Sequence, residues 1–252
     1  MEEKRRRIHL LDEIRGFAIL CMIVHHTFLD VGDVLNLNWG YKVFNALCYA
    51  QPIFWALFII ISGICTGLSR NAVKRGFLVL VCSGVITLVT ALVMPMFGFI
   101  ECEIYFGILH CLGFCMIAAG LAMPLIKKIN YKTGAIVSAV LFLFFYGIDS
   151  GSICFGLIDL PSSLMQNNLL APLGLHNADF YSADYFPLIP WIFMFFAGAF
   201  LGKPVSEGKL PETAYKKRSS FLSLVGRNSL WVYLAHQPVI YGIMFIIGLI
   251  IS

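Results

Sequence analysis

The chain has 252 residues, of which 59% are hydrophobic and only 13% are charged, whereas about 25% of the residues in a typical soluble domain are charged. This composition excludes an ordinary soluble domain and predicts an integral membrane protein. The formal net charge of +4 does not indicate a nucleic-acid partner, because the basic residues fall where they would mark membrane topology.

Seven apolar stretches are candidates for spanning helices, each of which needs about 20 predominantly apolar residues. Their long runs of Leu, Ile, Phe and Ala are not the alternating pattern of barrel strands. No repeat or soluble insertion separates them, so we expect an all-α membrane protein with a single domain over residues 1–252. The predicted spans are residues 14–31, 52–68, 76–100, 104–126, 134–148, 185–201 and 229–251.

The basic residues predict the orientation of this bundle. All 18 lysines and arginines except Lys42 lie at the N-terminus or in the second, fourth and sixth loops. Cytoplasmic loops carry the excess of positive charge. The N-terminus is therefore expected in the cytoplasm, and the loop of residues 149–184 outside.

Ionisable side chains occur inside the first span, where they are costly and mark function by default. Arg15 and His26 are eleven residues apart, so they share a helix face at a separation of about 16 Å, with His25 about 100° away. Helical spacing extends this face into a polar stripe, and one side of the helix should contact something other than lipid. The stripe also contains Asp12, Asp30 and Asp33.

Two further spans carry a histidine each. His110 is about 7 Å below the outer end of span four, at a depth similar to that of His26, and His236 is about 13 Å past Arg227, near the midplane. Histidine suits general-base work near neutral pH, and a carboxylate such as Asp30 or Asp184 could orient it.

Other polar groups suggest a ligand and its surroundings. A planar guanidinium such as that of Arg15 suits a phosphate-bearing ligand. The acidic and aromatic loop of residues 149–184 favours a folded lid, and Asp184 is placed to cap span six. Whether Cys48, Cys102 and Cys154 pair on the outer side is left open.

Five segments, in order along nearly the whole chain, carry a family resemblance. They are Leu11–Gly16 with His25-His26, Phe58–Gly63, Gly107–Gly113, Asp184–Trp191, and Gly226–Leu230 with Tyr233 and His236-Gln237-Pro238. Together they resemble bacterial members of the heparan-α-glucosaminide N-acetyltransferase catalytic-domain family of transmembrane acyltransferases.

This resemblance implies transfer of an acetyl group from cytosolic acetyl-CoA to an amine or hydroxyl acceptor at the outer side, a cell-envelope sugar being the natural candidate. It implies a multi-pass protein of a bacterial inner or plasma membrane, with an essential histidine and no metal. His26 matches the base best, and His25 and His110 compete with it. The expected catalytic residues are His26, His110, His25 and Asp184, and the expected donor-binding residues are Arg15, Ser62, Asn228 and His236.

The expected partners are the lipid bilayer and a small-molecule or glycan acceptor, and a homo-oligomer is left open. The sequence does not decide between direct transfer and an acetyl-histidine intermediate. A proton-coupled transporter with a histidine relay is the main alternative, for which helices broken at Pro190 and Pro238 would be suitable. A haem or metal protein using His26, His110 and His236 is disfavoured by the greater depth of His236 and by the lack of ligand spacing. A seven-helix receptor or scaffold is the last alternative.

Overall fold

The computed structural model describes residues 6–99 and 101–251. Lys4, Arg5 and Ile100, which entered the orientation and span predictions, lie outside these residues. Within the described part of the chain, seven helices are long and apolar enough to cross a membrane, which confirms the predicted all-α class. The chain divides into two compact units, residues 1–61 with 210–252 and residues 62–209. The single domain stays a prediction.

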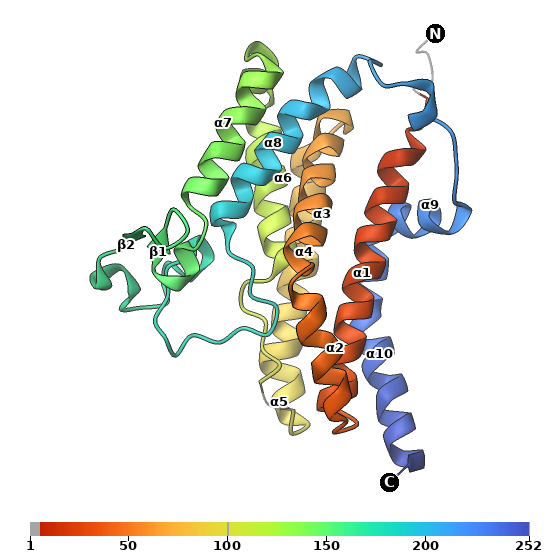
Figure 1. The fold of residues 1–252 in the computed structure, drawn as a ribbon, viewed down its shortest axis with the longest axis vertical. Coiled ribbons are helices and arrows are strands. Elements are labelled where there is room, and N and C mark those ends of the chain that lie inside the picture. The colour runs from red at the N-terminus through yellow and green to blue at the C-terminus, as the bar shows by residue number, and fades with distance from the viewer. Residues whose placement is uncertain (1–5, 100, 252) are drawn as a thin grey trace. The chain divides into compact units, whose positions relative to one another are not determined.

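The first unit is made of the N-terminal and C-terminal parts of the chain. Helix α1 lies beside α9 and α10, and α2 follows α1 directly (Figure 1). The sequence prediction contained neither α2 nor α9. The elements are α1 (His9–Asp33), α2 (Asn38–Cys48), the part of α3 (Gln51–Leu68) up to Ile61, a 3-10 turn (Glu212–Ala214), α9 (Ser220–Arg227) and α10 (Ser229–Ile251).

Helix α9 is held against α1 by close backbone contact and by a carboxylate. A Cβ atom at Gly226 would collide with the carbonyl oxygen of Asp12, so only glycine permits this approach. The buried Glu13 accepts hydrogen bonds from the backbone N–H groups of Arg218 (2.7 Å) and Ser219 (3.0 Å). Helix α1 starts five residues before the predicted span, and the Glu13 carboxylate in its first turns has hydrogen-bond partners.

The second unit contains the remaining spans, with α6, α7 and α8 packed in contact and α4 against α6 (Figure 1). A π-helical turn (Val89–Val93) joins α4 to α5. The helices are α4 (Ala72–Leu88), α5 (Met94–Met96), α6 (Ile108–Lys128), α7 (Tyr131–Phe144) and α8 (Leu188–Ser206). Between α7 and α8, the folded loop contains the antiparallel strands β1 (Ser152–Ile153) and β2 (Ile158–Asp159) and the 3-10 turns Ile148–Ser150, Ser162–Met165 and Ala171–Leu173.

The loop is folded, as predicted for a lid. The Tyr185 hydroxyl donates to the carbonyl oxygen of Ala171 (2.7 Å). Burial raises the pKa of this phenol well above its usual range, and the charge of Asp149 raises it further. The phenol therefore stays protonated and acts as a donor that holds the loop.

Several span boundaries differ from the predictions. Span three covers Ala72–Met96 instead of 76–100, span four Ile108–Lys128 instead of 104–126, span five Tyr131–Ser150 instead of 134–148 and span six Leu188–Ser206 instead of 185–201. Hydropathy alone does not locate the capping residues at which a helix begins, so the predicted boundaries differ by several residues. All eight cysteines lie in the described part of the chain and are free thiols, so Cys48, Cys102 and Cys154 form no disulfide.

Candidate active site

Three histidines of the first unit form a cluster between α1 and α10. The ring centroids of His26 and His236 are 5.3 Å apart, and those of His25 and His26 are 5.7 Å apart. The greater depth of His236 stays a prediction. Gly16 of α1 and Gly226 of α9 are in close backbone contact, and His26 and His236 each follow their glycine by ten residues.

His26 is the member of the cluster without hydrogen bonds. Its side chain is partly exposed, and among the residues that the structure describes neither ring nitrogen has a hydrogen-bond partner. His236, in contrast, has its Nδ1 against the carbonyl oxygen of Tyr233. Since a carbonyl can only accept, the Nδ1 of His236 carries a proton. One imidazole is thus oriented by backbone, and the neighbouring one is left available.

His25 has a different environment from His26. It is buried, with its Nε2 3.5 Å from the Cys48 sulfur and its ring 4.4 Å from the Phe44 ring. Both partners belong to α2. The helix-phase argument, which directed His25 toward a neighbouring helix or lipid, is thus confirmed. A packed position of this kind suits a structural role better than proton transfer.

Asp30, expected as a candidate to orient a histidine, binds an amide instead. The buried carboxylate accepts from the Gln237 side-chain nitrogen, 3.1 Å from each oxygen. The bond joins α1 to α10 one residue past His236, so Asp30 fixes the register of the two helices that carry the cluster. The polar stripe of α1 therefore contacts protein rather than lipid, as predicted.

Of the expected donor-binding residues in this unit, Arg15 has an unsatisfied group. Its Nε is buried and has no hydrogen-bond partner in the described residues. A buried donor without a partner is costly, so such an atom is suited to a ligand that supplies an acceptor. Asn228 lies at the junction of α9 and α10, where its side-chain amide donates to the carbonyl oxygen of Leu224 (2.9 Å).

In the second unit, His110 and Asp184 come together at the start of α6. The N–H of Gly107 donates to His110 Nδ1 (3.2 Å), and the N–H of Ile108 donates to Asp184 Oδ2 (3.4 Å). The expectation that Asp184 caps span six was wrong, because α8 begins after Pro187 without a side-chain cap. Both side chains instead satisfy free N–H groups at the start of span four.

The second nitrogen of His110 is also occupied. Its Nε2 is 3.3 Å from the Thr87 hydroxyl, which donates to the carbonyl oxygen of Ile104 (2.7 Å). These contacts are consistent only with a neutral ring that carries its proton on Nε2.

Ser62, another expected donor-binding residue, lies in α3 at a close helix contact. A Cβ atom at the next residue, Gly63, would collide with the carbonyl oxygen of Phe195, which supports close helix packing there.

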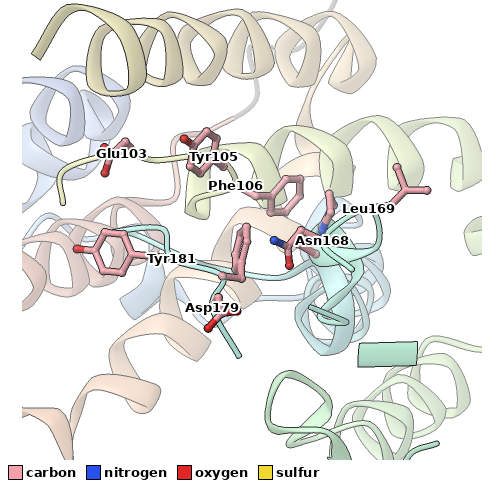
Figure 2. Close-up of a pocket in the computed structure, with 10 residues that line it drawn as sticks. Glu103, Tyr105, Phe106, Asn168, Leu169, Asp179 and Tyr181 are labelled. Carbon is pink, nitrogen blue, oxygen red and sulfur yellow. The ribbon is translucent and has the colours of Figure 1, made fainter. Parts of the chain in front are cut away.

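The sequence prediction missed a pocket in the second unit, with a volume of about 640 Å³. Figure 2 shows Glu103, Tyr105 and Phe106 on the segment that leads into α6, and Asp179 and Tyr181 on the long loop. Only the acidic and aromatic composition of the loop indicated this pocket, because its two walls are far apart in sequence.

The sequence model of the heparan-alpha-glucosaminide N-acetyltransferase catalytic region matches residues 7–238. The chain belongs to this family. The heparan-alpha-glucosaminide N-acetyltransferase family consists of membrane acetyltransferases that use acetyl-CoA, and membership selects the enzyme over the transporter, haem-protein and scaffold alternatives. Comparison with curated proteins and with solved structures gives no significant match. Within the described residues, no three His, Cys, Asp or Glu side chains are grouped closely enough to hold a metal ion.

Proposed function

We propose that the protein transfers an acetyl group from cytosolic acetyl-CoA to an amine or hydroxyl of a sugar at the outer side of a bacterial membrane, with His26 as the general base. The observation that carries this proposal is the imidazole of His26. It is partly exposed, it lies in a cluster of histidines, and it has no hydrogen bond to the described part of the chain. A general base needs a free ring nitrogen in reach of the acceptor proton.

The Nε of Arg15 supports a donor site on the same helix. When bound, acetyl-CoA supplies an activated thioester and several phosphate groups. The buried Nε of Arg15 lacks a partner, and a guanidinium can bind phosphate with two parallel hydrogen bonds. Arg15 is about 16 Å along α1 from His26, on the same face. We therefore assign phosphate binding to Arg15, with Asn228 and Ser62 as further donor-site candidates.

His26 moves one proton in the proposed reaction. It removes the proton of the acceptor amine or hydroxyl as that atom forms a bond to the thioester carbonyl carbon. It then returns the proton to the sulfur as the carbon–sulfur bond breaks, so atoms and charge balance. His236 holds its position through the Tyr233 carbonyl and packs beside His26 as a positioning residue. We favour direct transfer, because a base that both takes and returns the proton needs no covalent intermediate.

The proposed direction of transfer rests on the basic residues, which predict a cytoplasmic N-terminus. Labelling of single cysteines introduced at positions 70 and 209 with an impermeant maleimide should be weak in intact cells and strong after permeabilisation. Strong labelling at position 209 in intact cells would refute this orientation.

Acetyl transfer by the full chain in nanodiscs tests the base. His26→Ala should lower turnover by about 10² or more, the usual scale for loss of a general base, while acetyl-CoA still stabilises the protein against heat. His9→Ala is the matched control, because it removes an imidazole from the other end of the same helix and should leave turnover within about twofold. Wild-type turnover in a folded His26→Ala protein would overturn the assignment.

A further inference from the structure

Helix α7 is too short to cross a bilayer by itself. The apolar stretch of span five has 20 residues, but its α-helical part ends at Phe144 after 14 residues. Fourteen residues rise about 21 Å, whereas the hydrocarbon core of a bilayer is about 30 Å thick. Lys127 and Lys128, at the end of α6 just before α7, hold the start of α7 at one membrane surface. The end of α7 therefore lies within the opposite leaflet, with about 9 Å of the core still to cross.

The chain turns back beside the end of α7 instead of continuing outward. Gly147 and Gly151 have positive φ angles of 95° and 80°, which glycine adopts without strain. After these two turns, the N–H of Cys154 donates to the carbonyl oxygen of Phe144 (2.8 Å). The hairpin of β1 and β2 is therefore at the depth of the last turn of α7, and Figure 1 shows both strands beside the lower end of that helix.

The tip of this hairpin, residues 154–158, exposes apolar side chains. Phe155 is 63% exposed, Leu157 84% and Ile158 48%, and the tip contains no charged residue. Val140 and Leu143 of α7 are exposed in the same way, at 57% and 49%, as expected for a helix that faces lipid. Neighbouring exposed apolar side chains mark a contact surface, and at the depth of the end of α7 the surrounding medium is lipid.

The backbone of the tip is suited to an apolar medium. In lipid, a backbone N–H group without a partner in the protein is costly. In addition to the bond from Cys154, the N–H of Phe155 donates to the carbonyl oxygen of Tyr146 (3.4 Å), and that of Leu157 donates to the carbonyl oxygen of Cys154 (3.3 Å). These N–H groups therefore need no water.

Asp159 limits how deeply the hairpin can enter the leaflet. Its side chain is exposed, and it pairs with Ser152 at the base of the hairpin. A carboxylate is costly in hydrocarbon and stays at the headgroup level. Leu157 is two residues farther toward the tip, which is about 7 Å of strand. This reach agrees with the roughly 5–10 Å to which interfacial segments bury their apolar side.

We propose that the β1–β2 hairpin inserts its tip into the leaflet opposite Lys127 and Lys128. Phe155 and Leu157 lie among the acyl chains, and Asp159 lies at the headgroups. The partner is lipid and not another protein, because the tip continues the exposed apolar side of α7 at a depth that is still inside the hydrocarbon core. The hairpin thereby completes the crossing that α7 leaves unfinished and attaches the loop of residues 149–184 to the membrane. This inference needs only the membrane spans and is independent of acetyl transfer.

Photo-cross-linking of the full chain, in vesicles of a single phospholipid, identifies what surrounds the tip. With p-benzoylphenylalanine in place of Leu157, irradiation should give a product that is heavier by one phospholipid, as measured by mass spectrometry, with the cross-link on an acyl chain. The same photoreactive residue in place of Val140 is the lipid-facing control and should give the same product. In place of Glu207, which is exposed and paired with Lys209, it should give at least about tenfold less, because a charged loop stays in water.

Two outcomes of this experiment would overturn the proposal. A yield at position 157 as low as that at position 207 would mean that the tip is in water. A cross-link at position 157 mainly to a second chain would mean that protein covers the tip.

A second experiment tests whether the apolar side chains hold the tip in lipid. With the photoreactive residue in place of Phe155, Leu157→Asp should lower the yield of the lipid product about fivefold or more, because a carboxylate is costly in hydrocarbon. Leu157→Ile is the matched control and should leave the yield within about twofold, because it keeps the apolar volume. Gel filtration of each variant shows that it is folded. Equal yields in folded Leu157→Asp and Leu157→Ile proteins would refute the insertion, and the measurement at position 157 decides the proposal should Leu157→Asp not fold.

Discussion

The histidine cluster of α1 and α10 and the single histidine of α6 differ in whether the ring nitrogens have hydrogen-bond partners. A polar ring within an apolar helix needs hydrogen-bond partners. His110 has one for each nitrogen, from the Gly107 N–H and the Thr87 hydroxyl. His26 has none in the part of the chain that the structure describes. A histidine with both ring nitrogens occupied acts as a helix cap, whereas one left without partners is available for chemistry.

The first prediction is that His26→Ala lowers turnover, whereas His110→Ala lowers stability. His26→Ala should lose about 10² or more in turnover with little change in thermal stability. His110→Ala should lose about 1–3 kcal/mol of stability, since it leaves the Gly107 N–H without its acceptor, while turnover per folded molecule changes less than about tenfold. Thermal unfolding and single-turnover transfer on the same samples measure both quantities.

A rescue variant sharpens this prediction. The side-chain oxygen of His110→Asn can accept from the Gly107 N–H as the imidazole does, so this variant should recover part of the stability that His110→Ala loses. A large loss of turnover in a folded His110→Asn protein would instead place His110 in the chemistry.

The second prediction concerns donor binding at Arg15. Arg15→Ala should reduce the apparent affinity for acetyl-CoA about tenfold or more, because one charge-assisted phosphate contact is lost. The thermal shift at a fixed acetyl-CoA concentration measures this, since a ligand of the native state raises its stability. Arg7→Ala is the control, because Arg7 is already paired with Asp12 (2.7 Å). Equal shifts in the wild type and Arg15→Ala would remove Arg15 from the donor site.

The third prediction compares the carboxylates that cap distant helices in the two units. Glu13 accepts two short hydrogen bonds at the start of α9, whereas the hydrogen bond from the Ile108 N–H to Asp184 at the start of α6 is longer, 3.4 Å. Glu13→Ala should therefore cost about 1–3 kcal/mol, more than Asp184→Ala. Glu13→Gln should cost less than Glu13→Ala, because its amide oxygen still accepts. Denaturant unfolding of the wild type, Glu13→Ala, Glu13→Gln and Asp184→Ala measures their free energies of unfolding. A greater loss in Asp184→Ala than in Glu13→Ala would contradict the prediction.

Much of this architecture could be predicted from sequence, because it depends on local pattern. Apolar length determined the seven candidate spans, and helical phase placed Arg15 and His26 on one face and turned His25 toward another helix. The family was identifiable because its motifs are contiguous strings.

The predictions failed where contacts between distant segments decide the outcome. The start of α6 depends on Asp184, 76 residues away from Ile108, and the packing of α9 on α1 depends on the close approach of Gly16 and Gly226. Short helices such as α2 and α9 are stable only through packing, so periodicity gives them weak signals. The pocket joins residues 103–106 to the long loop, and nothing in either segment alone indicates the other.

The last prediction, with the smallest effect, concerns the exposed pair of Arg6 and Glu212, which contrasts with buried Glu13. Both atoms of the Arg6 fork bind the Glu212 carboxylate at 2.9 Å, and this hydrogen bonding lowers the pKa of Glu212 below its ordinary value. A lowered pKa stabilises the folded state above the ordinary pKa and loses that effect as pH falls through the folded value. Glu212→Gln should thus lower the melting temperature slightly at pH 7 and not at pH 3, and 1 M salt should remove the difference by screening. Glu207→Gln, which breaks the exposed Glu207–Lys209 pair (2.7 Å), should behave alike. A large, salt-independent loss in Glu212→Gln would mean that the exposed pair anchors the N-terminal segment as firmly as Glu13 anchors α9.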